Sequence, residues 1–376
     1  MILSQEHQML RDAVRQYARE QLAPNAASWD RDAVFPKEAL KGLAAMGLYG
    51  VAIPEEWGGA GMDHTALALA LEEIAIGDGA TSTIVQVNNL AAGILLGYGT
   101  PAQKERYLKP LARGDTLGAF ALTEPHTGSD ASAIRTRAER TGDSYVLNGV
   151  KQFITSGKYA DVAVVFAVTN KDAGKKGISA FVVPTTAPGY VVARVEEKTG
   201  QHASDTAQIV FEGCRIPAAN LLGTEGGGYR IALANLESGR INVAAQSVGM
   251  AQSALDAAIK YARERTTFGK PLIEHQAVNF RLADMATGIE AARQLYLHAA
   301  ALRDRGLPCL KEASMAKLFA SEAAEKVCSD AIQIHGGYGY LRDFPVERIW
   351  RDVRVTQIYE GASDIQRMVI GRALAS

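Results

Sequence analysis

One carboxylate near the C-terminus of the chain has a setting that suits a catalytic base. Glu360 follows the apolar pair Ile358 and Tyr359 and precedes Gly361, within the segment QIYEGASDIQ at 357–366. Apolar neighbours that hold a carboxylate away from water raise its pKa, towards the range in which it can both take and return a proton. The glycine lets the backbone turn so that other groups can approach.

The same segment also fits a purely structural interpretation. Glu360 could close one helix while Ser363 or Asp364 caps the next, because Ser and Asp side chains accept hydrogen bonds from the first free amides of a helix. The segment by itself leaves the two interpretations open at about even weight.

Three further segments carry groups that could bind a ligand. TEPHTGSD at 123–130 is rich in hydroxyls and turn formers, which can hydrogen-bond a polar planar ligand or satisfy their own backbone. ERTTFGK at 264–270 suits a pyrophosphate, although cations at the end of a helix are favourable without any ligand. GGYGY at 336–340 lacks the third glycine of a dinucleotide fingerprint, and the chain has no GxxxxGK[ST] loop, so both common phosphate loops are excluded.

The elements that must position these segments begin with a helical block. Apolar residues recur at three- and four-residue steps up to Gly114, as in Leu10, Val14, Tyr17 and Leu22. Pro36 stands where it can open a helix. The pattern predicts helices at 37–46, 65–75, 82–96 and 102–111.

A strand-rich block and a second helical block follow. Between Gly118 and Ile216 the apolar period changes to two and β-branched residues concentrate, which predicts short antiparallel strands in a barrel or sandwich. The turn at 141–143 predicts a hairpin. The predicted fold is an α+β multidomain protein, with an all-helical domain at 1–117, a central β domain at 118–225 and a helical bundle at 226–376. The bundle helices are expected at about 230–265, 275–304 and 309–334, with two shorter ones near the end.

Composition narrows the class of protein. The chain has 376 residues, 47% of them hydrophobic, and a formal charge of -1, so we expect a large core and neither nucleic acid nor a membrane as a partner. Cys214, Cys309 and Cys328 form no CxxC pattern and are expected to be core filler in a reducing compartment. The histidines show no metal-ligand spacing, so no metal site is expected. No secretory signal or membrane span is evident, and a cytoplasmic enzyme is the default.

Seven segments in one order along the chain together resemble the acyl-CoA dehydrogenase family. They are FALTEPHTGSD, NGVKQFITSG, GRINVAAQSVGMAQSALD, ARERTTFGKPLIEHQ, EASMAKLFASEAA, QIHGGYGYLRDFPVER and IYEGASDIQR. The resemblance is closest to short-chain and short-branched-chain members, as in SGRIN, KEASMAK and GGYGYL. It implies an N-terminal helical domain, a central β domain and a C-terminal four-helix bundle, assembled as a homotetramer that binds FAD without a covalent link and acts on an acyl-CoA.

The resemblance also implies which residues hold FAD. Side chains of the β domain would line the flavin: Phe120, Leu122, Thr123, Ser129, Phe153 and Thr155. A second set matches positions that hold the pyrophosphate and adenosine of a neighbouring subunit's FAD: Arg265, Phe268, Gln276, Gln333 and Gly337. Asp364 is a further expected FAD contact. The chain departs from the common pattern at Phe153, where tryptophan is usual, and at Ala362, where a threonine hydroxyl is frequent.

The acyl-CoA contacts and the base follow from the same resemblance. The expected substrate contacts are Ser129, Glu237, Arg240, Tyr359 and Gly361, and Glu360 matches the base. In one branch of the family the base stands just before the arginine; here that position is Gly239, which strengthens the assignment to Glu360. Glu237 precedes Arg240 by three residues, so we expect the two to face each other on a helix as a substrate or structural contact.

In the implied reaction Glu360 takes an α-proton while a hydride leaves the β-carbon for FAD, which gives a trans-2-enoyl-CoA, and electron-transferring flavoprotein then takes the electrons. The reaction serves fatty acid β-oxidation or branched-chain amino-acid catabolism. We expect acyl groups near butyryl size, in a pocket closed by residues 82–96 and 240–250. Because flavin and thioester should exclude water, we expect Glu360 to look unremarkable without them. The alternatives are a longer-chain dehydrogenase, an acyl-CoA oxidase, which is commonly a longer chain, and a non-catalytic flavoprotein that binds a partner.

Overall fold

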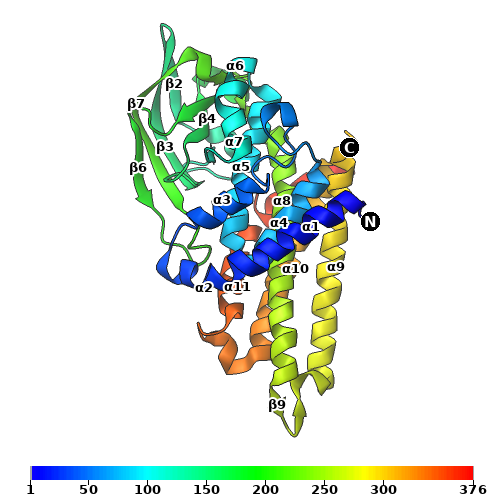
Figure 1. The fold of residues 1–376 in the computed structure, drawn as a ribbon. Coiled ribbons are helices and arrows are strands. Elements are labelled where there is room, and N and C mark those ends of the chain that lie inside the picture. Colours follow the sequence, from blue (N-terminus) through cyan, green and yellow to red (C-terminus); the bar gives the residue numbers. More distant parts are fainter. Residues whose placement is uncertain (1, 376) are drawn as a thin grey trace.

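The computed structural model describes residues 2–375 (Figure 1). Helices form both ends of the chain and a sheet lies between them in sequence, so the predicted order of helical, β and helical blocks is confirmed. In space the sheet lies beside the N-terminal helices at one end of the molecule, while long C-terminal helices extend to the other end.

The N-terminal block is helical, as its apolar periodicity predicted. Its helices are α1 (Gln5–Tyr17), α2 (Ala23–Asp32), α3 (Lys37–Ala45), α4 (His64–Gly77), α5 (Gly79–Tyr98), α6 (Pro101–Gln103) and α7 (Lys109–Arg113). Asp63 and Asp78 cap α4 and α5, because their side chains accept hydrogen bonds from the amides of Ala66 and Thr81. Both helices are buried along most of their length. They therefore form the centre of this block and can carry side chains into a site enclosed by the other two blocks.

The central block is an eight-stranded sheet with the order β6-β7-β3-β2-β4-β5-β8, and β1 pairs with β4. Most pairs are antiparallel, but β1 and β4 are parallel, so the prediction of a purely antiparallel sheet was too simple. The predicted hairpin joins β2 to β3 through Gly142, whose φ is +60°. The strands are β1 (Gly118–Ala121), β2 (Arg137–Thr141), β3 (Ser144–Thr155), β4 (Val162–Val168), β5 (Ile178–Pro184), β6 (Tyr190–Val195), β7 (Thr206–Pro217) and β8 (Leu221–Leu222).

Three long helices dominate the described part of the C-terminal block. They are α8 (Gly228–Glu264), α9 (Gln276–Asp304) and α10 (Leu310–His335), followed by the short α11 (Pro345–Val353) and α12 (Ser363–Ala375). The two short helices both pack against α10 and correspond to the two shorter helices predicted near the end of the chain. A small hairpin of β9 (Thr266–Thr267) and β10 (Lys270–Pro271) closes the far end of the bundle (Figure 1).

The blocks are joined by buried polar contacts as well as by apolar cores. Glu72 on α4 accepts hydrogen bonds from Arg293 of α9 at 2.8 Å and from the hydroxyl of Tyr296. The three cysteines are buried and free, as expected for core filler. Within residues 2–375 no helix is both long enough and apolar enough to span a membrane.

Candidate active site

Glu360 lies in a turn between a short helical turn that ends at Gln357 and the start of α12. Its φ is +54° and that of Gly361 is +89°, so two consecutive residues adopt the left-handed conformation. Such a conformation is costly for a residue with a side chain and persists only where its surroundings enforce it. The helical turn before Glu360 ends at Gln357 and α12 begins at Ser363, so Glu360 does not close a helix and that part of the structural interpretation is wrong.

The Glu360 carboxylate is half-buried and sparsely hydrogen-bonded. Its Oε1 accepts a hydrogen bond from Gln86 of α5 at 3.3 Å, and its Oε2 is buried with no partner among the described residues. Burial raises the pKa of Glu360, and the hydrogen bond from Gln86 and the charges of Arg240 and Lys317 oppose that rise. A partly desolvated carboxylate with a free oxygen is suited to accept a proton. The expectation that Glu360 would look unremarkable was wrong.

The neighbours that shelter Glu360 are not the ones that its sequence suggested. Ile358 is 58% exposed and contributes little cover. Helix α8 provides it instead, because a Cβ atom at position 239 would lie 2.7 Å from Glu360 Oε2. The absence of a side chain at Gly239 is what makes room for the carboxylate.

Glu360 stands where two adjoining cavities meet. The smaller, of about 220 Å³, also touches α5 and the start of α8, and its apolar wall includes Val87, Leu90, Leu233 and Leu236. The larger, of about 790 Å³, runs between the β domain and the segment around α11 and α12. Their shared walls include Thr123, Ser129, Phe153, Thr155, Tyr359, Glu360 and Gly361. The sequence had predicted that 82–96 and 240–250 close the pocket; α5 does, but of the second range only Arg240 reaches it.

The β-domain residues predicted to hold a flavin all line these cavities. Phe120 and Leu122 line the smaller, and Thr123, Ser129, Phe153 and Thr155 line both. Phe153 has a φ of +59° and is 62% exposed, so the backbone holds an aromatic ring towards the open cavity. An exposed ring beside two hydroxyls, in a cavity within the range of about 300–1,000 Å³ typical of ligand sites, fits a large planar polar ligand.

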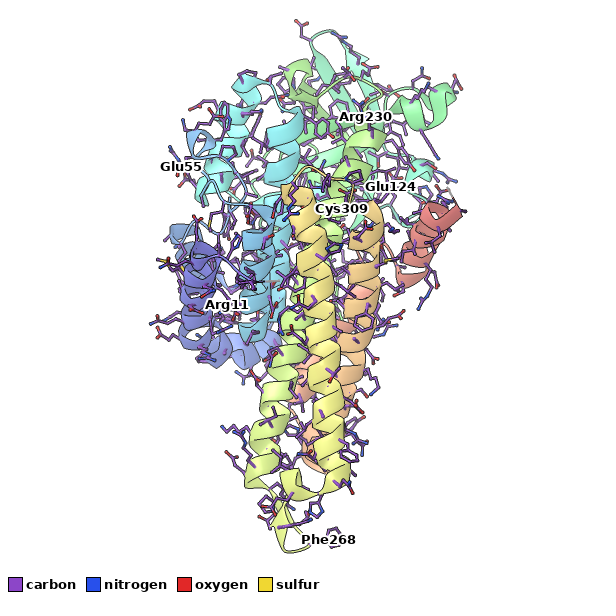
Figure 2. The ribbon with its side chains drawn as sticks, turned by 90° about the vertical axis from the view of Figure 1, so that its right-hand side faces the viewer. Arg11, Glu55, Glu124, Arg230, Phe268 and Cys309 are labelled. Carbon is purple, nitrogen blue, oxygen red and sulfur yellow. The ribbon has the colours of Figure 1, made fainter. Side chains whose placement is uncertain are left out.

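The second predicted cofactor set lies at the opposite end of the molecule. Arg265 and Gly337 line a separate pocket of about 430 Å³, beside Tyr261 and Tyr338. Phe268 is 97% exposed on the terminal hairpin, far from Glu124 of the β domain (Figure 2). Gln276 and Gln333 are exposed near this end and are not among the pocket's lining residues. Arg240 and Arg265 are separated along α8 by roughly 37 Å, at about 1.5 Å per residue.

Two predicted contacts are not brought to the cavity around Glu360. The charge of Glu237 acts on Arg240, opposing the burial that lowers the pKa of that guanidinium, but its direct contacts are structural: its Oε1 pairs with Arg303 at 3.2 Å and accepts a hydrogen bond from Cys309 Sγ at 3.1 Å. Its role as a substrate contact stays a prediction. Asp364 is exposed in the first turn of α12, 3.5 Å from Arg367, and lines none of the cavities described above.

Three family models match successive parts of the chain. They are the acyl-CoA dehydrogenase N-terminal domain at residues 4–115, the middle domain at 119–214 and the C-terminal domain at 226–375. The chain belongs to the acyl-CoA dehydrogenase family. The predicted family and the predicted class of enzyme are thus confirmed, while the predicted boundaries at 117/118 and 225/226 stay predictions.

Individual relatives in this family are similar over almost the whole chain. An acyl-CoA dehydrogenase from Bacillus subtilis is 48% identical over 100% of this chain and 99% of its own length. A mitochondrial short-chain specific acyl-CoA dehydrogenase from Rattus norvegicus is 48% identical over 98% of this chain and 90% of its own length. Among solved structures, butyryl-CoA dehydrogenase from Megasphaera elsdenii superimposes with a TM-score of 0.98 at 41% identity, with 100% of both chains covered. A structure described as electron transferring flavoprotein of Acidaminococcus fermentans has a TM-score of 0.98 at 46% identity and covers 100% and 99% of the two chains.

Within this acyl-CoA dehydrogenase fold, a closed ring of hydrogen bonds holds Tyr359, the residue before the candidate base. Tyr359 Oη donates to Gln246 Oε1 at 2.5 Å, and Gln246 Nε2 donates to Thr83 Oγ1. Thr83 Oγ1 donates to Gln201 Oε1 at 2.7 Å, and Gln201 Nε2 lies 3.5 Å from Tyr359 Oη. The ring joins α5, the β domain, α8 and the turn of Glu360, so all three blocks fix the position of Tyr359.

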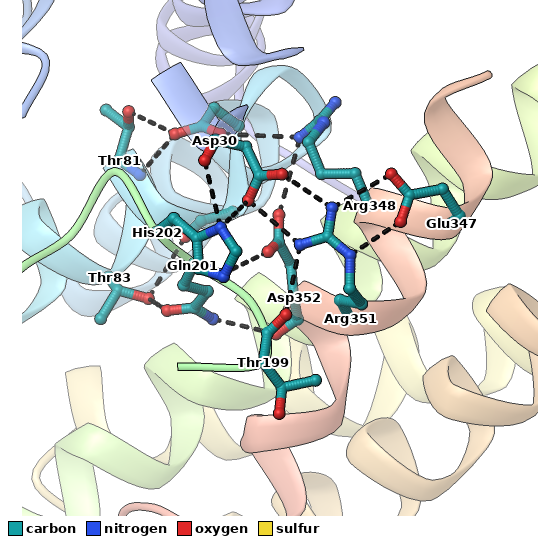
Figure 3. A network of polar contacts seen from close by, with 12 residues as sticks. Asp30, Thr81, Thr83, Thr199, Gln201, His202, Glu347, Arg348, Arg351 and Asp352 are labelled. Atoms are coloured by element: carbon teal, nitrogen blue, oxygen red, sulfur yellow. Dashed lines mark hydrogen bonds and ion pairs between the residues drawn. The ribbon is translucent and has the colours of Figure 1, made fainter. Parts of the chain in front are cut away.

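Gln201 also ties this ring to a larger polar network (Figure 3). Its backbone N–H donates to the buried carboxylate of Asp352 on α11. In the same network Asp30 of α2 pairs with Arg351 of α11 at 2.7 Å and with His202 at 3.0 Å. The contact between Asp30 and Arg351 thereby joins α2 to α11, which lie about 320 residues apart in sequence. Sequence reasoning missed Gln86, Gln201 and Gln246, because amides on helices and loops carry no spacing signal.

Proposed function

We propose that the chain dehydrogenates a short acyl-CoA to the trans-2-enoyl-CoA, with FAD as its cofactor and Glu360 as the base. The observation that carries the proposal is the Glu360 carboxylate at the junction of two cavities, half-buried, with a free Oε2 and two cationic neighbours. Bound FAD supplies the acceptor for the hydride that leaves the β-carbon. The protein's own task is to orient the thioester and to remove the α-proton.

Removal of that proton needs a place for negative charge on the thioester carbonyl oxygen. The backbone N–H of Glu360 has no acceptor among residues 2–375, so it is available to donate to that oxygen. Base and oxyanion donor would thus belong to one residue.

The small cavity supports a short acyl group. Its volume of about 220 Å³ is bounded by branched side chains of α5 and α8. The similarity to short-chain relatives points the same way. Electron-transferring flavoprotein is the acceptor that we infer from the family, and a cytoplasmic location stays a prediction.

The division of predicted cofactor residues supports an assembly of at least two subunits, as the predicted homotetramer would provide. Arg265 and Gly337 line a pocket at the far end of α8 from Arg240, so the two predicted sets within one chain lie too far apart to hold the same cofactor molecule. A second subunit that places its hairpin end beside the first subunit's β domain would reunite the two sets.

The test is anaerobic addition of butyryl-CoA to the FAD-loaded protein. We expect the flavin absorbance to be bleached at a rate that falls by ~10²–10⁴-fold in Glu360→Gln, since an oriented base contributes that much, while FAD stays bound. Wild-type rates in FAD-loaded Glu360→Gln would remove Glu360 from the mechanism. A panel of acyl-CoAs from C4 to C16, with isobutyryl and isovaleryl, tests chain length; an optimum at C8 or longer would refute the short-chain proposal.

A further inference from the structure

Lys317 is a buried cation without a carboxylate partner. It lies on α10, its side chain is fully buried, and it forms no ion pair within 4.0 Å among residues 2–375. Its one hydrogen bond runs from Nζ to the carbonyl oxygen of Gly361 at 2.9 Å. Because a buried charge is expensive, lysines are almost never fully buried unless something requires the charge there. What this lysine touches is the turn that carries the candidate base.

The carbonyl oxygen of Gly361 accepts a second hydrogen bond besides the one from Lys317. Gln366 Nε2, also fully buried, donates to Gly361 O at 2.8 Å and to Glu360 O at 3.1 Å. Both lone pairs of the Gly361 carbonyl are therefore used. Lys317 from α10 and Gln366 from α12 together fix the two peptide planes on either side of Gly361, and so fix the turn from which the Glu360 side chain projects.

The charge of Lys317 also acts on Glu360. Three elements pack around this carboxylate, and the groups that face it are Arg240 from α8, Lys317 from α10 and the neutral Gln86 from α5. Tyr359 is adjacent in the chain and Glu322 is the other carboxylate that acts on Lys317. Two cations and one carboxylate thus share a half-enclosed space, which favours the ionised form of Glu360 over the protonated form.

We propose that Lys317 is a positioning residue for the base: it fixes the turn at Gly361 and keeps a positive charge beside Glu360 so that its carboxylate stays ready to accept a proton. The inference rests on the proposed function, in which Glu360 is the base. Burial lowers the pKa of Lys317 to about 8, so its charge is present at neutral pH and is lost as the pH rises beyond that value.

The test compares Lys317→Met and Lys317→Gln with Lys326→Met, a control on the same helix whose side chain is 73% exposed. Flavin reduction by butyryl-CoA is followed between pH 5.5 and 9. Without the charge of Lys317, the pKa of Glu360 rises, so the pH of half-maximal rate should move up by on the order of one unit in both Lys317 variants and stay in place in the control. Lys317→Arg, which retains the charge, should restore the midpoint.

A second measurement isolates the proton step. Acetyl-CoA has no β-carbon and cannot lose a hydride, so exchange of its α-protons for deuterium in D₂O, followed by NMR, reports on the base alone. We expect slower exchange at pH 7 in both Lys317 variants and almost none in Glu360→Gln. If Glu360→Gln exchanges normally, the proposed function fails. If only Glu360→Gln is impaired and the Lys317 variants keep the wild-type midpoint, or if they never accumulate as FAD-loaded protein, Lys317 is structural and this inference is overturned.

Discussion

Replacing Gly239 with alanine should lower the activity of the protein without lowering its stability. Gly239 lies inside α8, where alanine is favoured over glycine by ~1 kcal/mol because the glycine backbone loses more freedom on folding. The new Cβ would however lie 2.7 Å from Glu360 Oε2 and 2.9 Å from Glu360 Cδ. The substitution therefore stabilises helix α8, while the Glu360 carboxylate must move away from position 239.

The size of the effect follows from these distances. Ordinary contacts to a Cβ begin at 3.4 Å, so the carboxylate must retreat by roughly 0.7 Å. A misplacement of about 1 Å can cost about 10²-fold in rate, because the reacting atoms leave their aligned geometry. We expect Gly239→Ala to reduce flavin more slowly by on the order of 10- to 100-fold, with an unfolding midpoint equal to or above that of the wild type.

The assay is single-turnover flavin reduction by butyryl-CoA, paired with thermal unfolding of the FAD-loaded protein. Gly97→Ala is the matched control, because Gly97 is an exposed residue of α5 and a Cβ there would meet nothing within 4 Å. It should gain stability without losing rate. Wild-type reduction by Gly239→Ala would show that Glu360 reacts from another position, and the steric reasoning would be wrong.

Two further predictions concern the supports of the site. Tyr359→Phe removes the donor to Gln246 and should destabilise the protein by ~1–3 kcal/mol, because the buried amide oxygen loses its partner; unchanged denaturant unfolding would contradict this. Burial raises the pKa of Asp205 from its ordinary value of 3.8 to about 6, so the folded state prefers the uncharged form, and ionisation of this carboxyl weakens the fold as the pH rises between these two values. Asp205→Asn should therefore raise the free energy of unfolding relative to the wild type at pH 8, by ~3 kcal/mol at most, and leave it unchanged at pH 3, where the wild-type carboxyl is protonated in both states. An equal effect at both pH values would show that the gain does not come from ionisation of Asp205.

The sequence was enough to predict the order of the helical, β and helical blocks and the main helices and strands within them. Helices α4 and α5 and strands β4 and β5 were predictable. Apolar periodicity and β-branched runs are local properties of the sequence, and they indicate which face of an element is buried. The parallel pairing of β1 with β4 was not, since a parallel neighbour depends on a long connection that leaves no local pattern.

The candidate site shows the same division. Glu237 and Arg240 are three residues apart on α8, yet Glu237 turns to Arg303 of α9, because tertiary partners decide which way a long side chain points.

The sequence by itself determined the family, the carboxylate at position 360 and the residue types that line the cavities beside it, since these are properties of the letters and their order. Only the tertiary structure decided what surrounds that carboxylate: the left-handed turn, the space left by Gly239, and the buried Lys317 that fixes the next carbonyl. The physical reason is that the pKa and direction of a side chain depend on charges and atoms within a few ångströms, and around Glu360 these come from α5, α8 and α10, which lie far from it in the chain.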